Sequence, residues 1–572
     1  MKGRAGAFTI ACALAGAGAG HGQDGEWVTL TSLRLARQET GAARIGGTIY
    51  VVGGLVANGA ATASVEAYEV SADRWLDVAP MPAPRDHAAV AALGGKLYVA
   101  GGFAGDFRAI DTVFVYDPAG DAWSESARLP SARGGAWSVE LGRRLYLFGG
   151  VDRFGIARRE SFVYDPAAGQ WSEAALMPSA REHLNAVAVD GLVYVIGGRA
   201  GGASAANERY DPGTNTWLVL EPLPTARSAM ALAALNGRIH AMGGEVPRLF
   251  DTHEVYDPAT NSWTLGQPMP IPRHGVPAVA LGDRILVPGG GTVQGLDPTA
   301  HVDAFVVDGT SGGGCVAGDE TLCLQGGRFS LVVEWRDPAD GAVRRARARS
   351  QVDQTGIFSF FDDENFELLV KVLDGRAING AFWLFYGALS DVEYTIFATD
   401  TSDGRMRLYH NPEGRLASAG DVDAFPADDD VGAPTEAAAA AAASSVPGRV
   451  ASGGAAACVE DEETLCLQGG RFSVRVTWRA SNGTSGLGSV LESSRTDPSG
   501  LFTFFDPGNV ELALKLLDGR ALNGHFWLFY GALSDLEYTV TLSDTHSGAT
   551  REYVNTTGRF VSAADLEAFG DP

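Results

Sequence analysis

Basic side chains are scarce in this sequence relative to acidic ones. The chain has 44 Lys and Arg residues against 69 Asp and Glu residues, which gives a formal net charge of −25 over 572 residues. An acidic protein has no general electrostatic attraction for nucleic-acid phosphates or anionic lipid. The sequence also contains no Lys/Arg-rich run and no zinc-finger spacing of Cys and His. Nucleic-acid binding is therefore not expected.

Long apolar runs are also missing, because no segment beyond the N-terminus has eighteen consecutive apolar residues. A helix that crosses a bilayer needs about 20 such residues, so no membrane span is expected. The N-terminus has Lys2 and Arg4, then the short apolar stretch 5–17 and small residues up to position 19. This order is typical of an export signal. We expect residues 1–19 to be a signal peptide and the protein to be exported from a bacterial-type cell, to the periplasm, the cell surface or the extracellular space.

Cysteine is rare, with five residues in the chain and none between positions 20 and 314. The four that follow the signal peptide form two pairs with the same spacing of eight positions: Cys315 with Cys323, and Cys458 with Cys466. An even number of cysteines in an exported protein is typical of disulfides. The alternative is a metal site, but no histidine lies beside either pair. We favour two disulfides.

Glycine, by contrast, is abundant at 74 residues, and part of it marks an internal repeat. A double glycine follows an apolar strand pattern six times, at steps of 48, 48, 48, 46 and 46 residues. The six are Gly53-Gly54, Gly101-Gly102, Gly149-Gly150, Gly197-Gly198, Gly243-Gly244 and Gly289-Gly290. An aromatic residue follows each one, and in five repeats a tryptophan stands seven positions later: Trp75, Trp123, Trp171, Trp217 and Trp263. Repeats of this length predict an array of β units.

This motif set resembles the kelch repeat, whose fold is a propeller of four-stranded blades. The resemblance implies a six-bladed propeller over residues 20–308. In five repeats the tryptophan stands ten positions before an arginine, and Trp27 stands ten positions before Arg37. We therefore expect the segment around Trp27 to supply the missing outer strand of the last blade, which would close the ring and remove an exposed strand edge.

Six arginines occupy one level of this repeat: Arg37, Arg85, Arg133, Arg181, Arg227 and Arg273. They precede the innermost strand of each blade, so we expect them around one mouth of the central channel. Guanidinium groups bind carboxylate, sulfate or phosphate in a bidentate manner, which makes a ligand-binding ring one hypothesis. The alternative is a structural role, in which the arginines bond to neighbouring backbone or to carboxylates such as Glu39, Asp86 and Glu182.

Three histidines follow these arginines by one or two positions: His87, His183 and His274. With Glu182 they are candidates for a binding or acid–base site. They come from alternating blades and are expected to lie across the channel from one another, so we predict no metal site and no cofactor. Packing or surface roles are the alternative for these histidines.

Two kinds of kelch enzyme bear on the activity. Galactose-oxidase-like enzymes need copper and a cysteine crosslinked to tyrosine, and the propeller segment has no cysteine. That chemistry is therefore disfavoured. The chain also resembles sialate mutarotases, which are exported bacterial six-bladed propellers. For such chemistry Arg181, Glu182 and His183 would be the acid–base candidates on an anionic sugar.

The second half contains a duplication. Residues 315–336 match 458–479 at an offset of 143, and residues 373–395 match 517–539 at an offset of 144. We expect a linker at 309–314, a β module at 315–425, an Ala/Pro/Ser-rich linker at 426–457 and a second β module at 458–572. Alternating apolar residues separated by turn residues predict a small antiparallel sandwich in each module. The expected fold class is therefore all-β: a six-bladed kelch β-propeller followed by two small antiparallel β-sandwich-like domains.

The leading functional hypothesis is a secreted or surface-displayed binding protein that uses the arginine-ringed mouth. Its partner would be a protein or an anionic glycan. Two alternatives remain: a carbohydrate-active enzyme that resembles sialate mutarotases, and a non-catalytic extracellular scaffold. The sequence predicts no nucleic-acid partner and leaves the oligomeric state open.

Overall fold

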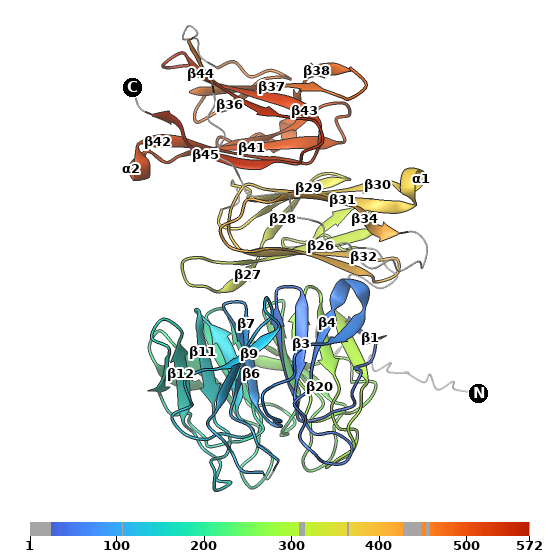
Figure 1. The fold of residues 1–572 in the computed structure, drawn as a ribbon, viewed down its shortest axis with the longest axis vertical. Coiled ribbons are helices and arrows are strands. Elements are labelled where there is room, and N and C mark those ends of the chain that lie inside the picture. The colour runs from blue at the N-terminus through green and yellow to red at the C-terminus, as the bar shows by residue number, and fades with distance from the viewer. Residues whose placement is uncertain are drawn as a thin grey trace, which may run out of the picture.

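The computed structural model describes residues 25–105, 107–307, 315–362, 365–426, 449–452 and 458–570. The expected signal peptide and the linker 309–314 lie outside the described residues, as does most of the linker 426–457. The described chain is almost entirely β-structure, as predicted, and divides into a propeller and two sandwiches (Figure 1). Among the described residues, no helix has the length and apolar character needed to cross a membrane.

The propeller consists of six four-stranded antiparallel sheets. From the channel outward the blades are β2 Gly41–Ile45, β3 Thr48–Val52, β4 Val65–Glu69, β5 Arg74–Asp77; β6 Ala89–Leu93, β7 Lys96–Ala100, β8 Val113–Asp117, β9 Ala122–Glu125; β10 Trp137–Leu141, β11 Arg144–Phe148, β12 Ser161–Asp165, β13 Gln170–Ala174; β14 Asn185–Val189, β15 Leu192–Ile196, β16 Asn207–Asp211, β17 Thr216–Val219; β18 Ala231–Leu235, β19 Arg238–Met242, β20 His253–Asp257, β21 Ser262–Leu265; and β22 Val279–Leu281, β23 Arg284–Pro288, β24 Val302–Val307, β1 Gly25–Leu30. A 3-10 helix, η1 Val70–Ala72, lies between β4 and β5.

The ring is closed by the N-terminal strand. Strand β1 pairs antiparallel with β24, and Trp27 stands opposite Phe305. The last blade therefore takes its outer strand from the start of the described chain and its inner strands from the end of the repeat region. Strand β1 therefore covers the edge of β24, which would otherwise be unpaired.

Hydrogen bonds from tryptophan tie each blade to the one before it. The indole Nε1 of Trp75 donates to the carbonyl of Thr31 (2.8 Å), and that of Trp123 donates to the carbonyl of Ala79 (2.7 Å). The other four repeat the contact: Trp171 with Ala127, Trp217 with Ala175, Trp263 with Glu221 and Trp27 with Gln267. The tryptophan of the repeat thus fills the outer gap between blades and satisfies a backbone carbonyl there.

Each module is a sandwich of two antiparallel sheets. Module 1 has β25 Leu322–Leu324, β26 Phe329–Arg336, β27 Val343–Arg345, β32 Tyr394–Asp400 and β33 Met406–Asn411 in one sheet, and β28 Arg347–Val352, β29 Thr355–Ser359, β30 Leu368–Asp374, β31 Ala381–Ala388 and β34 Ser418–Pro426 in the other, with α1 Arg376–Asn379. Module 2 has β35 Arg449–Ser452, β36 Leu465–Leu467, β37 Phe472–Arg479, β38 Ser485–Leu487, β43 Glu537–Asp544 and β44 Ala549–Asn555, and opposite them β39 Ser489–Val490, β40 Ser499–Thr503, β41 Val510–Asp518, β42 His525–Ala532 and β45 Ser562–Gly570, with η2 Glu492–Ser494 and α2 Arg520–Asn523. One apolar core fills each sandwich between its two sheets.

The two cysteine pairs are disulfide-bonded, Cys315 to Cys323 and Cys458 to Cys466. Each disulfide joins Cys315 or Cys458 to a cysteine eight positions later in strand β25 or β36. The pairing by equal spacing that the sequence favours is therefore the one in the structure. The disulfides anchor the entry of the chain into each sandwich.

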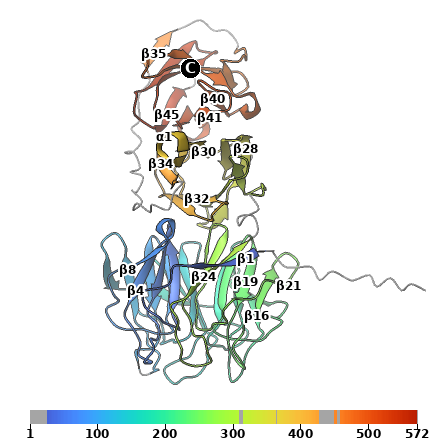
Figure 2. The ribbon, with the colours of Figure 1, turned by 90° about the vertical axis from the view of Figure 1, so that its right-hand side faces the viewer.

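The propeller, module 1 and module 2 form one column (Figure 2). Module 1 covers the propeller face that carries the turns between the first and second strands of the blades. Phe397 and Met406 of module 1 pack in one buried cluster with Leu281 of the propeller. Around them, Arg44 pairs with Glu334 (2.5 Å). Further ion pairs are Arg336 with Glu140 (3.3 Å) and Arg143 with Glu413 (3.2 Å). One end of the channel therefore lies under module 1.

The two modules face each other through equivalent residues. Their interface cluster joins Ile357 and Leu389 of module 1 with Leu501 and Leu533 of module 2, each pair 144 positions apart. The hydroxyls of Ser418 and Ser562, which are also 144 positions apart, are hydrogen-bonded at 2.6 Å. Equivalent residues that meet in this way define an approximate two-fold axis, as in an isologous dimer. The duplication has thus produced a pseudo-dimer within one chain.

Candidate functional site

The six repeat arginines lie inside the blades, with exposed fractions between 0 and 6%. In four blades the guanidinium group pairs with a carboxylate two positions before the aromatic residue that follows the double glycine. These pairs are Arg37–Glu66 (2.8 Å), Arg181–Glu208 (2.5 Å), Arg227–Glu254 (2.5 Å) and Arg273–Asp303 (2.7 Å). In the other two blades phenylalanine fills that position, and the guanidinium groups of Arg85 and Arg133 lie over the rings of Phe114 and Phe162.

The arginines also bind the backbone at the double glycines. Arg181 donates to the carbonyl of Gly197 (2.6 Å), and Arg227 donates to that of Gly243 (2.8 Å). Burial lowers the pKa of Arg227 and opposes its charge, while the Glu254 carboxylate favours it. A buried charge needs such partners, and the blade supplies them. The six repeat arginines therefore lie inside the blades, where they pack against neighbouring residues. Their guanidinium groups do not line the mouth of the channel.

Two positions after each arginine the backbone forms a closed ring around the channel axis, which we call the inner ring. Its six residues, one before each innermost strand, are Glu39, His87, Gly135, His183, Ala229 and Gly275. Each backbone N–H donates to the carbonyl of the preceding member, at distances from 2.7 to 3.0 Å, and Glu39 donates to Gly275 to close the circle. All six have a positive φ between 48° and 63°, a conformation that glycine adopts most readily.

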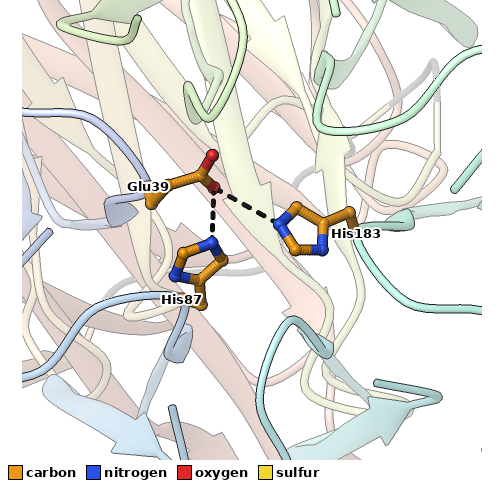
Figure 3. Close-up of side chains that lie close together, drawn as sticks. All are labelled: Glu39, His87 and His183. Atoms are coloured by element: carbon orange, nitrogen blue, oxygen red, sulfur yellow. Dashed lines mark ion pairs between the residues drawn. The ribbon is translucent and has the colours of Figure 1, made fainter. Parts of the chain in front are cut away.

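Three inner-ring members carry long side chains, and these meet on the axis (Figure 3). The Glu39 carboxylate lies 3.3 Å from His87 Nε2 and 3.8 Å from His183 Nε2. The two imidazole rings are 4.8 Å apart, centre to centre. The histidines do come from alternating blades, but the channel is narrow here, so they touch and do not lie across it from one another as expected. All three side chains are at most 10% exposed.

A neighbouring carboxylate binds the Nδ1 atom of each of these two histidines. His87 Nδ1 lies 2.5 Å from Asp86 Oδ1, and His183 Nδ1 is hydrogen-bonded to Glu182 Oε2. An ionised carboxylate only accepts, so the Nδ1 atom carries the proton and the Nε2 atom faces Glu39. The residues between the arginine and the inner ring therefore fix the orientation of the imidazoles.

A second group of side chains completes the site. His274 Nε2 lies 3.6 Å from Glu39 Oε1 and 3.7 Å from Glu245 Oε2. Arg199 donates to Glu182 (2.5 Å) and to Glu245 (2.8 Å). We call the eight charged or titratable residues the mouth cluster: Glu39, Asp86, His87, Glu182, His183, Arg199, Glu245 and His274. It contains four carboxylates, three imidazoles and one guanidinium group, so its formal charge is −3 when the histidines are neutral.

The two inner-ring histidines have opposite proton affinities. Burial disfavours the imidazolium form of His87, but the carboxylates of Glu39 and Asp86 outweigh it and raise the pKa. Burial and the positive charges of His87, Arg199 and His274 lower the pKa of His183 well below its ordinary value. The site therefore holds a strong and a weak base against one carboxylate, which is typical of functional sites.

Aromatic side chains connect the mouth cluster to the outer surface. The ring of His87 packs against Phe103 (5.1 Å), which packs against Phe107 (5.8 Å). Phe107 is 67% exposed and lies on the loop between β7 and β8. Below the inner ring, Trp137 lines both a small channel pocket that Glu39, His87 and His183 also line and a chamber of about 320 Å³ that Arg336 of module 1 also lines. Module 1 thus lies at one end of the channel and the mouth cluster at the other.

The sequence contained signals for the residues that the predicted site omitted. Glu39 stands two positions after Arg37, in the same place as His87 after Arg85 and His183 after Arg181. Arg199 and Glu245 directly follow the double glycines of their repeats. These positions pair by short bridges with the residue after the repeat arginine, as Glu182 pairs with Arg199. Reading every repeat at these two positions, and at the position directly after the repeat arginine, would have identified the whole mouth cluster.

The sequence matches a known family over the propeller. Residues 29–177, and in a second overlapping match residues 126–290, match the family model described as the KLHDC2/KLHL20/DRC7 Kelch-repeats domain. With the six four-stranded antiparallel sheets, this match makes residues 25–307 a kelch-type β-propeller. The matched residues do not extend into the two modules. Kelch propellers carry unrelated functions, so the match defines the fold and leaves the activity open.

A solved structure described as "Structure of YjhT" resembles the chain with a TM-score of 0.43 and 18% sequence identity, over 48% of this chain and 95% of that one. A comparison with curated protein sequences found no match.

Proposed function

We propose that this protein is an exported binding protein, secreted or displayed at the cell surface, whose recognition face is the open mouth of the propeller. The observation that supports this most is the convergence of the mouth cluster on the channel axis. The opposite end of the channel lies under module 1, so the mouth is the end of the channel that module 1 does not cover. The two disulfides support an oxidising, exported environment.

The charge of the mouth indicates the kind of ligand. Four carboxylates face one guanidinium group, and Arg199 is already paired with Glu182 and Glu245. Because a narrow site of one sign concentrates ligands of the other sign, the mouth favours cationic groups. An anionic glycan would meet Glu39 at the centre of the ring. We therefore propose a partner that presents an amine, a guanidinium group or a metal ion.

Exposed apolar side chains favour a protein partner. Phe154 is 71% exposed and Ile156 is 53% exposed, and both lie on the loop between β11 and β12 on the mouth side of the propeller. With Phe107 they give this face apolar contacts around a charged centre. Protein interfaces commonly combine aromatic anchors with a few buried polar groups.

Binding of the mature chain to an array of charged ligands tests this function. The array would hold peptides and oligosaccharides that carry amines, carboxylates or no charge, and the Glu39→Gln variant would be compared with Glu552→Gln at an exposed position of module 2. We expect selective binding of amine-bearing ligands, weakened by Glu39→Gln only. A folded protein that prefers acidic ligands would contradict the proposed charge selectivity, and one that binds none of them would support a scaffold role.

A further inference from the structure

We propose that Glu39, His87 and His183 form a binding site for a divalent transition-metal ion at the centre of the mouth. This inference deepens the proposed function, because it names a cation for the same site, and it rests on the mouth being a ligand site. Within the described residues, these three are the group whose ligand atoms all lie within 4.8 Å of one another (Figure 3).

The orientation of the side chains suits a cation between them. His87 and His183 direct their Nδ1 protons at Asp86 and Glu182, which are acceptors. In a neutral imidazole the Nε2 atom then has a lone pair and no proton. Both Nε2 atoms face the same Glu39 oxygen, at 3.3 and 3.8 Å, so three acceptors converge on one point. In the structure Arg199 Nη2 lies 3.2 Å from His183 Nε2. A metal ion bound to all three acceptors would replace this contact and leave Arg199 with its carboxylate partners, Glu182 and Glu245.

The distances suit direct coordination. Zinc binds imidazole nitrogen and carboxylate oxygen at about 2.0–2.2 Å, which places neighbouring ligand atoms of a tetrahedron about 3.4 Å apart. The separations of 3.3 and 3.8 Å between Glu39 and the two histidines are close to that value. Two imidazoles and one carboxylate favour zinc or another first-row transition metal over calcium or magnesium, which prefer oxygen ligands.

The surrounding residues have the features of a metal site. Asp86 and Glu182 behind the imidazoles form the carboxylate–histidine arrangement that orients metal-binding histidines. His274 Nε2 lies 3.6 Å from the other Glu39 oxygen and could contribute a fourth nitrogen. The nearby positive charge of Arg199 is paired with Glu182 and Glu245, so the cluster keeps an excess of negative charge.

The backbone of the inner ring gives an independent argument. Glu39, His87 and His183 have φ values of 53°, 53° and 48°, where glycine is the unstrained residue. The chain does use glycine at the equivalent positions 135 and 275. A Cβ atom at Gly275 would lie 2.5 Å from the Glu39 carboxyl group, so this glycine also makes room for the proposed ligand. Of the four non-glycine residues at these positions, three have the side chains that meet on the axis, and the fourth is Ala229, with a φ of 50°.

Metal titration of the untagged, chelator-treated full chain tests the proposal. Zn²⁺ binding would be measured calorimetrically with Mg²⁺ present, and Co²⁺ would report imidazole coordination through its visible absorption. We expect one ion per chain, at least about tenfold weaker binding in His87→Gly and in His183→Gly, and a smaller loss in Asp86→Asn. Glycine variants suit the backbone of the ring, so they should remain folded. His525→Gln in module 2 serves as the histidine control and should bind as the wild type does.

Two results would overturn the metal site: a folded wild type that takes up no stoichiometric Zn²⁺, or uptake that survives the His87→Gly/His183→Gly double variant. The array experiment uses no added metal, so it distinguishes the two proposals. Selective binding of amines without Zn²⁺ uptake would remove the metal and leave the recognition face. Zn²⁺ uptake without array binding would leave the metal site and remove the broader function.

Discussion

One arginine in each blade lies where water does not reach it, and its surroundings decide what it contributes. In four blades the guanidinium group and a carboxylate form a buried ion pair, as Arg227 and Glu254 do at 2.5 Å. In the blade of Arg85 the described partners are the Thr112 hydroxyl, the Pro84 carbonyl and the ring of Phe114. Removing Arg227 therefore leaves the buried carboxylate of Glu254 without its countercharge, whereas removing Arg85 leaves the ring of Phe114 without its cation.

Alanine substitutions should separate these two kinds of arginine. Arg227→Ala strands Glu254 as an unpaired buried carboxylate, which typically lowers the free energy of unfolding by about 3–5 kcal/mol. Arg85→Ala loses hydrogen bonds and a cation–π contact, and we expect a loss of about 1–3 kcal/mol. Calorimetric unfolding of the full chain measures both. Equal losses, or a larger loss for Arg85→Ala, would contradict the assignment of partners.

The burial of these arginines could not be predicted from their position in the repeat alone. The sequence shows that they share one level, but a guanidinium group can point into a blade or into the channel from the same backbone position. The deciding residue is remote: Glu208 follows Arg181 by 27 positions and stands two positions before Tyr210. The sequence also shows that the inner-ring residues share one repeat position, but their convergence on the axis depends on a backbone circle that joins all six blades.

At the scale of elements, the two modules are held together by lysines and glutamates that have little access to water. Lys515 lies 3.5 Å from Glu367 across the interface. Its equivalent, Lys371, donates to the Asn509 side chain (2.9 Å) and to the Val510 carbonyl (3.0 Å). Burial lowers the pKa of Lys371 to about 8, although the Glu511 carboxylate opposes this shift. Burial also raises the pKa of Glu511 to about 7.

These shifts make the module pair sensitive to pH. Between pH 4.5 and about 7, Glu511 keeps a proton in the folded state that the unfolded state has lost, so stability falls as pH rises through this window. Lys371 has the opposite sign, and its contribution returns only as pH rises from about 8 toward 10.5. Urea unfolding at pH 5 and pH 7 should show a loss for the wild type, up to about 1.4 kcal/mol per pH unit, that Glu511→Gln reduces. An unchanged pH dependence in that variant would contradict this assignment.

A double substitution tests the coupling of the same residues. Lys371→Met alone removes the positive charge that favours the ionised form of Glu511, so we expect it to destabilise the modules at pH 8, above the pKa of Glu511. Adding Glu511→Gln removes the unpaired charge and should recover most of that loss. Chemical unfolding of the four proteins in this cycle gives the coupling. Additive effects of the two substitutions would mean that the residues do not interact across the interface.

The outer sheets of the two modules explain why only module 1 packs on the propeller. Phe397 and Met406 enter the propeller cluster, while module 2 has Thr541 and Thr550 at the equivalent positions, 144 residues later. The duplication was evident in the sequence. The sequence did not show which copy contacts the propeller, because that contact depends on Leu281 and its neighbours in another part of the chain.

Exchanging these residues should separate module 1 from the propeller. The Phe397→Thr/Met406→Thr variant removes the apolar contacts of the interface, and large-to-small substitution of a buried phenylalanine alone costs about 3–5 kcal/mol. We expect a more extended particle in small-angle scattering and faster proteolysis between residues 307 and 315, with both modules still folded. Scattering and proteolysis identical to those of the wild type would contradict a role for these residues in docking.

At the scale of the whole molecule, the channel has two different ends. Module 1 packs over the turns of the inner strands, and the mouth cluster lies at the start of those strands. The sequence predicted six blades, their closure by an N-terminal strand and two sandwiches, since each follows from spacing within a repeat. Which end of the channel stays open depends on contacts between module 1 and the propeller, such as the ion pair of Arg336 with Glu140. No local sequence pattern contains these contacts.

The most direct test of the central claim, that the open mouth is the recognition site, is ligand-array binding by a variant with an emptied ring, Glu39→Gly/His87→Gly/His183→Gly. Glycine fits the positive φ of these positions, so the fold should persist with an unchanged or higher Tm. Asn236→Gly makes the same backbone change at an exposed turn on the opposite face, where φ is 54°, and serves as the control. We expect the emptied ring to lose binding of amine-bearing ligands while Asn236→Gly keeps it. Wild-type binding by the folded triple variant would place recognition elsewhere on the molecule.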